Sequence, residues 1–199
     1  MPKNELIMHR GNYINHRLRV KTQEEINLSA EILKKIHKII QRYPQGKQKS
    51  ALLPVLHLVQ EEFGSHLSVN LMDKVAEILS IQAIEVYEVA SFYSQFNLDK
   101  PGKYVLEVCH TAPCAICGGD DIVDYLKEKL QIEVGETSAD GLFTLKTVEC
   151  LGACGYAPVM QVDTEFIENL DTEKIDQLIE TLKKQTEKPH ELRWAERFF

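Results

Sequence analysis

The sequence contains no run of 18 or more apolar residues, so we expect no membrane-spanning helix. Residues 1–22 are polar and lack the apolar stretch of a secretory signal. Glu5 and the absence of serine from that segment also disfavour a transit peptide. We therefore interpret residues 1–21 as an N-terminal arm that is mobile or bound to a partner.

An excess of positive charge is also missing, because the formal net charge is −7 over 199 residues. Nucleic-acid surfaces depend on basic stripes, so this balance argues against one. The sequence has neither a G-x-G-x-x-G fingerprint after an expected strand nor a P-loop. Its seven histidines are spread out, and none accompanies an evident nucleophile. We expect no catalytic residue and no substrate site in this chain.

Hydrophobic residues make up 44% of the chain, which is enough for a packed core in one large or two small domains. Over residues 22–98, apolar residues recur at helical spacing in four segments, which predicts a helical bundle. Thr22 and Glu25 fit a capping box for the first helix, Ser50 a cap for the second, and Ser68 a cap for the third.

The pattern changes over residues 99–185, where strands are expected at 104–108, 142–148, 159–162 and 165–169. Asp163 and Thr164 fit a hairpin turn between the last two strands. Helical patterns follow the first strand and close the segment, which gives the order β-α-β-β-β-α. The predicted fold class is α+β or α/β, with a helical bundle before a small sheet domain. Residues 186–199 form a C-terminal tail.

All five cysteines lie in the second part, in the groups Cys109-x4-Cys114-x2-Cys117 and Cys150-x3-Cys154. An odd number does not suit a disulfide framework, and clustered cysteines in a reducing compartment more often bind metal or carry redox chemistry. Each group follows an expected strand. If those strands are parallel neighbours, both loops leave the same edge of the sheet and the cysteines converge.

A [2Fe–2S] cluster needs four thiolates, and its negative charge requires positive potential from the protein. A helix starting near Gly118 would provide that potential through its free N–H groups. Glycines flank the cysteines and allow close backbone approach with N–H···S bonds; they are Gly118, Gly119, Gly152 and Gly155.

Three alternative sites remain open from the residues alone. A structural zinc site would use C-x2–4-C pairs, and the spacing of both groups falls within that range. A dithiol site would use Cys114 and Cys117 as a C-x-x-C motif at a strand–helix turn. A plant-type ferredoxin spacing would keep the cluster but use Cys117 in place of Cys154. Otherwise Cys117 is interpreted as a small buried hydrophobic residue.

The sequence resembles the family of the 24 kDa subunit of respiratory complex I, which in bacteria is the E subunit of NADH:quinone oxidoreductase. The resemblance covers about residues 26–184 and rests on these segments: Ser50-Ala-Leu-Leu-Pro54, Glu85-Val-Tyr-Glu-Val-Ala-Ser-Phe-Tyr93, Cys109-x4-Cys114, Val148-Glu-Cys150-Leu-Gly-Ala-Cys154 and Glu168-Asn-Leu. It implies a thioredoxin-like domain with one [2Fe–2S] cluster on Cys109, Cys114, Cys150 and Cys154. Where the family usually has a basic residue, this chain has Cys117.

The resemblance further implies a one-electron carrier within an NADH dehydrogenase. FMN and NAD would be bound only by a partner flavoprotein subunit, against which we expect the helical bundle to dock. The chain would be cytoplasmic and held at the inner face of an energy-transducing membrane through its partners. The same module occurs in soluble NAD-linked hydrogenases and formate dehydrogenases. A zinc-stapled assembly module without a redox role is the alternative from another functional class.

Overall fold

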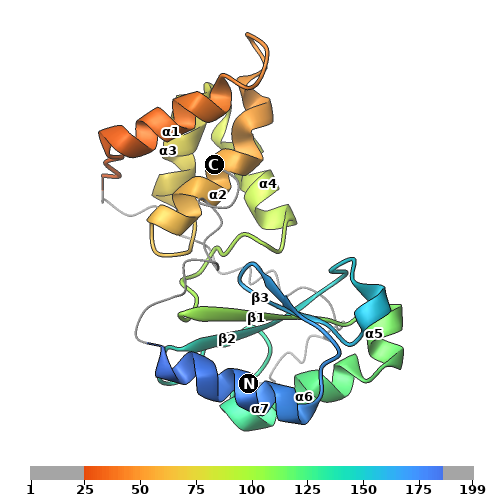
Figure 1. The fold of residues 1–199 in the computed structure, drawn as a ribbon. Helices are drawn as coiled ribbons and strands as arrows, with labels where there is room; N and C mark the ends of the chain where they lie inside the picture. The colour runs from red at the N-terminus through yellow and green to blue at the C-terminus, as the bar shows by residue number, and fades with distance from the viewer. Residues whose placement is uncertain (1–24, 186–199) are drawn as a thin grey trace, which may run out of the picture.

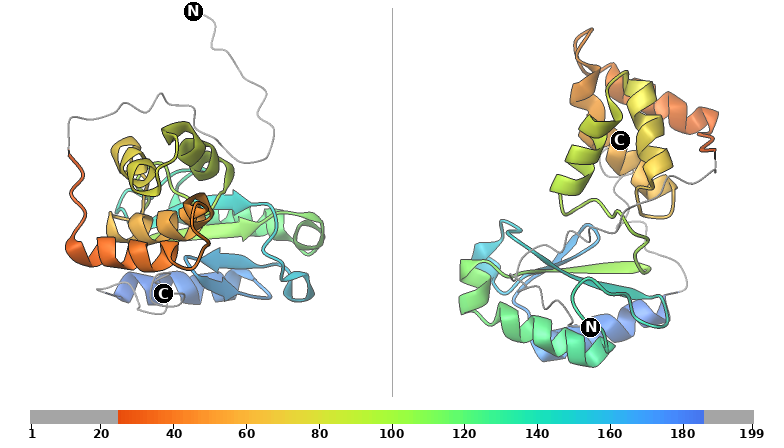
Figure 2. Two further views of the ribbon diagram at one scale, coloured as in Figure 1. Left: turned by 90° about the horizontal axis from the view of Figure 1, so that it is seen from above. Right: turned by 180° about the vertical axis from the view of Figure 1, so that it is seen from behind.

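The computed structural model describes residues 25–185 and arranges them as a helical unit and a sheet unit (Figure 1). The helical unit lies on one side of the sheet, and two long helices cover the other side (Figures 1 and 2). The expected arm at residues 1–21 and the expected tail at residues 186–199 lie outside the described residues. Within residues 25–185, no helix is both long enough and apolar enough to cross a membrane.

The helical unit consists of α1 (Ala30–Ile40), η1 (Gln48–Ala51), α2 (Leu52–Glu62), α3 (Val69–Leu79) and α4 (Ala83–Phe92). Its helices turn apolar stripes toward one shared core, as amphipathic helices must when water surrounds their other faces. Ile36, Leu56 and Leu79 are fully buried there. The bundle predicted from the helical spacing is therefore confirmed.

Two predicted helix starts are wrong. Residues 25–29 are not helical, and α1 begins after Ser29, whose hydroxyl accepts the Ile32 N–H at 3.2 Å. Ser29 lies next to the apolar stripe and Thr22 does not, so the nearer residue caps the helix. Ser50 lies inside η1, and the Leu52 N–H at the start of α2 bonds to the Lys49 carbonyl of that turn. Ser68 caps α3 as predicted, accepting the Leu71 N–H.

The sheet has the strands β1 (Tyr104–Cys109), β2 (Phe143–Val148), β3 (Met160–Val162) and β4 (Glu165–Ile167), in the order β2-β1-β3-β4. Strands β1 and β2 are parallel, whereas β3 is antiparallel to both β1 and β4. Asp163 takes a φ of 53° in the tight β3–β4 turn, as the expected hairpin requires. Strand β4 is shorter than predicted because the Asn169 N–H leaves the ladder and bonds to the Tyr156 carbonyl.

Helices α6 (Gly119–Leu130) and α7 (Thr172–Lys184) cover one face of the sheet (Figure 1). Leu126, Ile175 and Ile179 are buried in this second apolar core. The first strand was predicted as an alternating one, yet all six residues of β1 are buried. The difference arises because the central strand is covered on both faces, including the face that carries Glu107.

Candidate metal centre

The two cysteine loops leave the same edge of the sheet. Strands β1 and β2 run parallel with Cys109 opposite Val148, so the segments after them begin side by side. Figure 1 shows the turn η2 (Cys154–Tyr156) next to the short helix α5 (Ala112–Ile116) at this edge. The parallel strands and the shared edge expected from the sequence are thereby confirmed. We call residues 109–118 and 149–157 the cysteine edge.

A short helix that the sequence prediction missed places Cys114. Helix α5 begins after Thr111 and has Pro113 in its first turn, where a missing N–H costs nothing. Cys114 is buried on its inner side, whereas Cys117 is exposed at its C-terminal end. The prediction of Cys117 as a buried hydrophobic residue is therefore wrong. Pro113 was the available signal for a helix start.

Cys109 and Cys114 form a hydrogen-bonded thiol pair. Burial opposes ionisation of Cys109, but hydrogen bonds from Thr111, from the Leu151 backbone and from Cys114 outweigh it and hold its pKa below the usual value. Burial and the bond to Cys109 raise the pKa of Cys114 to about 11. Cys109 is thus the more acidic thiol, and Cys114 is the donor in the pair.

The second loop holds its thiols at the surface. Cys150 and Cys154 are both exposed, and the Gly152 N–H points to the Cys150 sulfur at 3.4 Å. The charge of Cys154 is close enough to Cys114 to raise the pKa of that thiol further. Among residues 25–185, no three His, Cys, Asp or Glu side chains are gathered as a ready site for a metal ion. The thiols therefore share one edge without forming a closed ligand shell.

The start of α6 packs tightly against the first loop. Gly118 has a φ of 93°, and a Cβ on Gly119 would lie 2.8 Å from the Cys114 carbonyl oxygen and 3.0 Å from that of Cys109. Only glycine permits this approach of the helix to the backbone of both cysteines. The N-terminus of α6 thus lies at the cysteine edge, as the sequence predicted.

Backbone N–H groups supply positive potential at this edge, among them that of Gly152. The sequence has no Lys or Arg within residues 105–126 or within residues 147–173. His110 and Glu149 face each other at 3.9 Å between Nε2 and Oε1, which exceeds hydrogen-bond distance. Soft thiol ligands on two converging loops, with an N–H donor to one sulfur, fit an iron–sulfur group, which is bound through Cys thiolates.

Sequence reasoning also missed two neighbours of the cysteines. The Thr111 hydroxyl lies 3.5 Å from the Cys109 sulfur, and no pattern in a single sequence marks a hydroxyl for that contact. The Glu149 carbonyl lies 3.3 Å from the same sulfur and accepts from its protonated form. That contact depends on the backbone path of the second loop and is independent of the side chain.

Comparison with known proteins agrees with this geometry. The family model described as thioredoxin-like [2Fe-2S] ferredoxin matches residues 36–183. The chain is similar to the E subunit of the NADH-quinone oxidoreductase of Rickettsia felis, with 42% identity over 79% of this chain and 90% of that protein. It is 43% identical to the mitochondrial NADH dehydrogenase [ubiquinone] flavoprotein 2 of Dictyostelium discoideum, covering 79% of this chain and 64% of that protein.

Among solved structures, an NAD+-reducing [NiFe]-hydrogenase in the air-oxidized state has a similar fold, with a TM-score of 0.60. The match covers 74% of this chain but only 25% of the hydrogenase chain, at 24% sequence identity. This likeness concerns the arrangement of helices and strands alone.

Proposed function

Because the chain belongs to the thioredoxin-like [2Fe-2S] ferredoxin family and binds one [2Fe–2S] cluster, we propose that it is the electron-carrying subunit of an NADH:quinone oxidoreductase. The observation that supports this most is the parallel register of β1 and β2, which brings four cysteines to one edge. Relatives at 41–42% identity that are named as the E subunit of NADH-quinone oxidoreductase point to the same assembly.

The proposed ligands are Cys109, Cys114, Cys150 and Cys154, two from each loop. The buried thiol pair anchors the cluster from the first loop, and the exposed pair closes it from the second. The Gly152 N–H and the start of α6 compensate the negative charge of the group. Cys117 is exposed beside this set, so its exchange for Cys154 is the ligand alternative to test.

The bound cluster supplies a site that takes up and releases single electrons. The chain's own residues bind it, shield it on the buried side and leave its outer side accessible. This division of labour agrees with the absence of a nucleotide fingerprint from the sequence. The electrons come from FMN reduced by NADH, both held by a partner flavoprotein subunit.

We place the partner against the cysteine edge and the helical unit together. Exposed apolar side chains occur on both, including Ile116 with 85% of its surface exposed and Phe92 with 78%. Large exposed apolar side chains are more favourable when a partner covers them. The complex would lie at the cytoplasmic side of an energy-transducing membrane, held there through other subunits.

The first test is chemical analysis of the purified chain. Iron and acid-labile sulfide should each approach two per chain, with a red-brown colour that bleaches on reduction. A colourless protein with one zinc ion per chain would refute the redox function. It would favour an assembly module that is stabilised by a structural zinc ion.

A second test adds the flavoprotein subunit. NADH should reduce the cluster only in its presence, so reduction of an acceptor by the chain and NADH alone would contradict the proposal. Recovery of the complex from membranes favours a quinone-linked assembly, whereas recovery from the soluble fraction favours an NAD-linked hydrogenase or formate dehydrogenase.

A further inference from the structure

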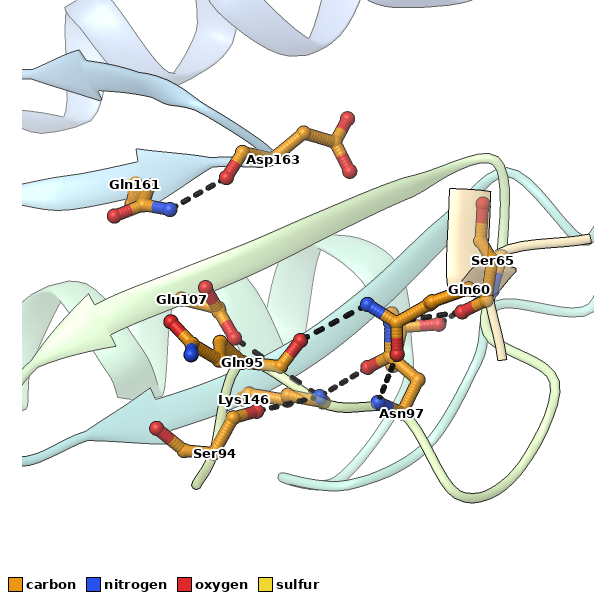
Figure 3. Close-up of polar contacts among 11 residues, drawn as sticks. Gln60, Ser65, Ser94, Gln95, Asn97, Glu107, Lys146, Gln161 and Asp163 are labelled. Carbon is orange, nitrogen blue, oxygen red and sulfur yellow. Dashed lines mark hydrogen bonds and ion pairs between the residues drawn. The ribbon is translucent and has the colours of Figure 1, made fainter. Parts of the chain in front are cut away.

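A polar junction connects the helical unit to the sheet unit on the sheet face opposite α6 and α7 (Figure 3). The apolar cores of the two units share no residue within the described part of the chain. The connecting segment leaves α4 at Phe92 and reaches β1 at Tyr104. One end of this segment bonds to the helical unit and the other end bonds to the sheet.

The first end belongs to the helical unit through Asn97. Its backbone N–H donates to the Gln60 Oε1 at 2.7 Å, and its carbonyl accepts the Leu67 N–H at 2.7 Å. Its side-chain Nδ2 donates to the Ser65 carbonyl at 3.0 Å. Leu98 packs against the same apolar core. Three polar groups of Asn97 are thus used within the helical unit.

The other end belongs to the sheet. The Gly102 N–H donates to the Thr144 hydroxyl on β2 at 2.6 Å, and the Lys103 N–H donates to the Gly141 carbonyl at 3.0 Å. Between Leu98 and Gly102 lie only residues 99–101, of which Asp99 and Lys100 are exposed. The orientation of the two units therefore also depends on contacts between the helical unit and the sheet.

One such contact comes from Lys146 on β2. Its Nζ donates to the Asn97 Oδ1 and to the Ser94 carbonyl, which lies 3.4 Å away. The third group near it is Glu107 on β1, with 3.9 Å between Nζ and Oε1. Glu107 and Lys146 are direct neighbours in the parallel register, and only 10% of the Glu107 side chain is exposed. Figure 3 shows the ammonium group between these residues of both units.

We propose that Lys146 and Asn97 form a polar latch that holds the helical unit in one orientation on the cysteine-bearing sheet. The Lys146 ammonium donates to two oxygens of the helical unit, the Asn97 Oδ1 and the Ser94 carbonyl, and it lies at ion-pair distance from the Glu107 carboxyl group on β1. Burial raises the pKa of Glu107 to about 7 and the nearby Lys146 ammonium opposes that rise, so the ionised carboxylate offsets part of the cost of burying the lysine. This proposal concerns the chain alone and holds whichever partner it serves.

The latch can be tested by amide hydrogen exchange of the cluster-loaded full chain, read by mass spectrometry. In Asn97→Leu, the amide exchange rates of residues 94–98 and 65–67 should rise at least about tenfold. The reason is that loss of the side-chain hydrogen bonds makes local opening of these segments more frequent. The double variant Glu107→Gln with Lys146→Met leaves every residue of the helical unit unchanged. It should accelerate exchange within residues 94–98 in the same way while α2 and α3 stay protected.

Two further variants separate the latch from a general loss of packing. Asn97→Asp keeps an oxygen for Lys146, so its exchange within residues 94–96 should remain at the wild-type level. Lys103→Met removes a lysine whose Nζ bonds to the Gln185 carbonyl inside the sheet unit, and it should also leave residues 94–98 unchanged.

Small-angle X-ray scattering should show a broader distribution of interatomic distances only for Asn97→Leu and for the double variant. The absorption spectrum of the cluster should stay unchanged in both. Wild-type exchange and scattering in the double variant would overturn the proposal. Equally accelerated amide exchange within residues 94–96 in Asn97→Asp and in Asn97→Leu would overturn it as well.

Discussion

Cys109 lies directly opposite Val148 in the parallel pair of strands β1 and β2, only two residues before Cys150. This register makes residues that are far apart in the sequence neighbours at one edge of the sheet. A shift of the strands by one residue would turn the side chains of β2 to the opposite faces of the sheet. The apolar contacts of β1 and β2 with α6 and α7 therefore determine where the thiols meet.

The ligand set can be tested with two serine substitutions. Cys154→Ser should lower the iron and sulfide content strongly, because it removes one of the four proposed thiolates. Cys117→Ser should retain the wild-type content, since that exposed side chain lies outside the proposed set. Metal analysis and visible absorption spectra measure both. The opposite pattern, with the cluster lost in Cys117→Ser and kept in Cys154→Ser, would establish the plant-type spacing.

Close packing at the start of α6 predicts an asymmetry between two glycines. Gly119→Ala should destabilise the protein by about 1–3 kcal/mol, because its Cβ would overlap the carbonyls of Cys109 and Cys114. Gly155→Ala is the matched control, since nothing lies within 4 Å of a Cβ placed there. Denaturation with urea, followed by circular dichroism, gives the two free energies of unfolding. Equal stability of the two variants would show that the backbone of the first cysteine loop can move to accommodate the added Cβ without loss of stability.

Stability should fall in mild acid because of His57. Burial lowers the pKa of His57 from 6.5 to about 4 in the helical unit, where its ring lies 4.9 Å from that of Phe96. The unfolded chain therefore binds a proton between these values and the folded chain does not, so stability is lost as the pH falls below 6.5. From pH 7 to pH 5 this group should reduce the free energy of unfolding by about 2 kcal/mol.

Other groups titrate in the same range, so the comparison needs a variant without the imidazole. His57→Gln should lose about 2 kcal/mol less than the wild type between the two pH values. Urea denaturation at pH 7 and at pH 5 provides the four free energies. Parallel losses in both proteins would mean that His57 binds its proton equally well in the folded state.

A cation introduced at the cysteine edge should raise the reduction potential. Cys117→Arg places a positive charge next to a site that has no Lys or Arg in either flanking segment. An interaction of about 1 kcal/mol with the added electron corresponds to a rise of about 40 mV. Cys117→Ser is the neutral control. A redox titration followed by electron paramagnetic resonance measures both potentials, and an unchanged value for Cys117→Arg would place that side chain out of electrostatic reach.

Much of this fold follows from patterns that a single sequence contains. The helical spacing before residue 98 and the order of strands after it both have local causes, because each depends on where water and core lie around one element. From the sequence, the parallel pairing of β1 with β2 is only the condition under which the two cysteine loops would leave the same edge, and the structure fulfils that condition. Ser68 and Asp163 were recognisable because a helix cap and a tight turn each require particular residue types.

The remainder depends on contacts between distant segments. Ser29 and Thr22 are both acceptable caps in isolation, and only packing of the first apolar stripe selects Ser29. The burial of Glu107 cannot be read from β1, because the cover comes from the segment after α4. The role of Asn97 is hidden for the same reason, since its partners lie on α2, on the loop after it and on β2.

The crossover through α6 has a consequence for how the protein is made. During translation Cys109 and Cys114 leave the ribosome well before Cys150 and Cys154, and the strand that joins the pairs emerges between them. If all four proposed cysteines are ligands, the early thiols complete a cluster only once β2 has paired with β1, which requires closing a long loop of chain. With this ligand set, iron and sulfide can be fully bound only after synthesis has passed Cys154, and β3 and β4 are still to be made at that point.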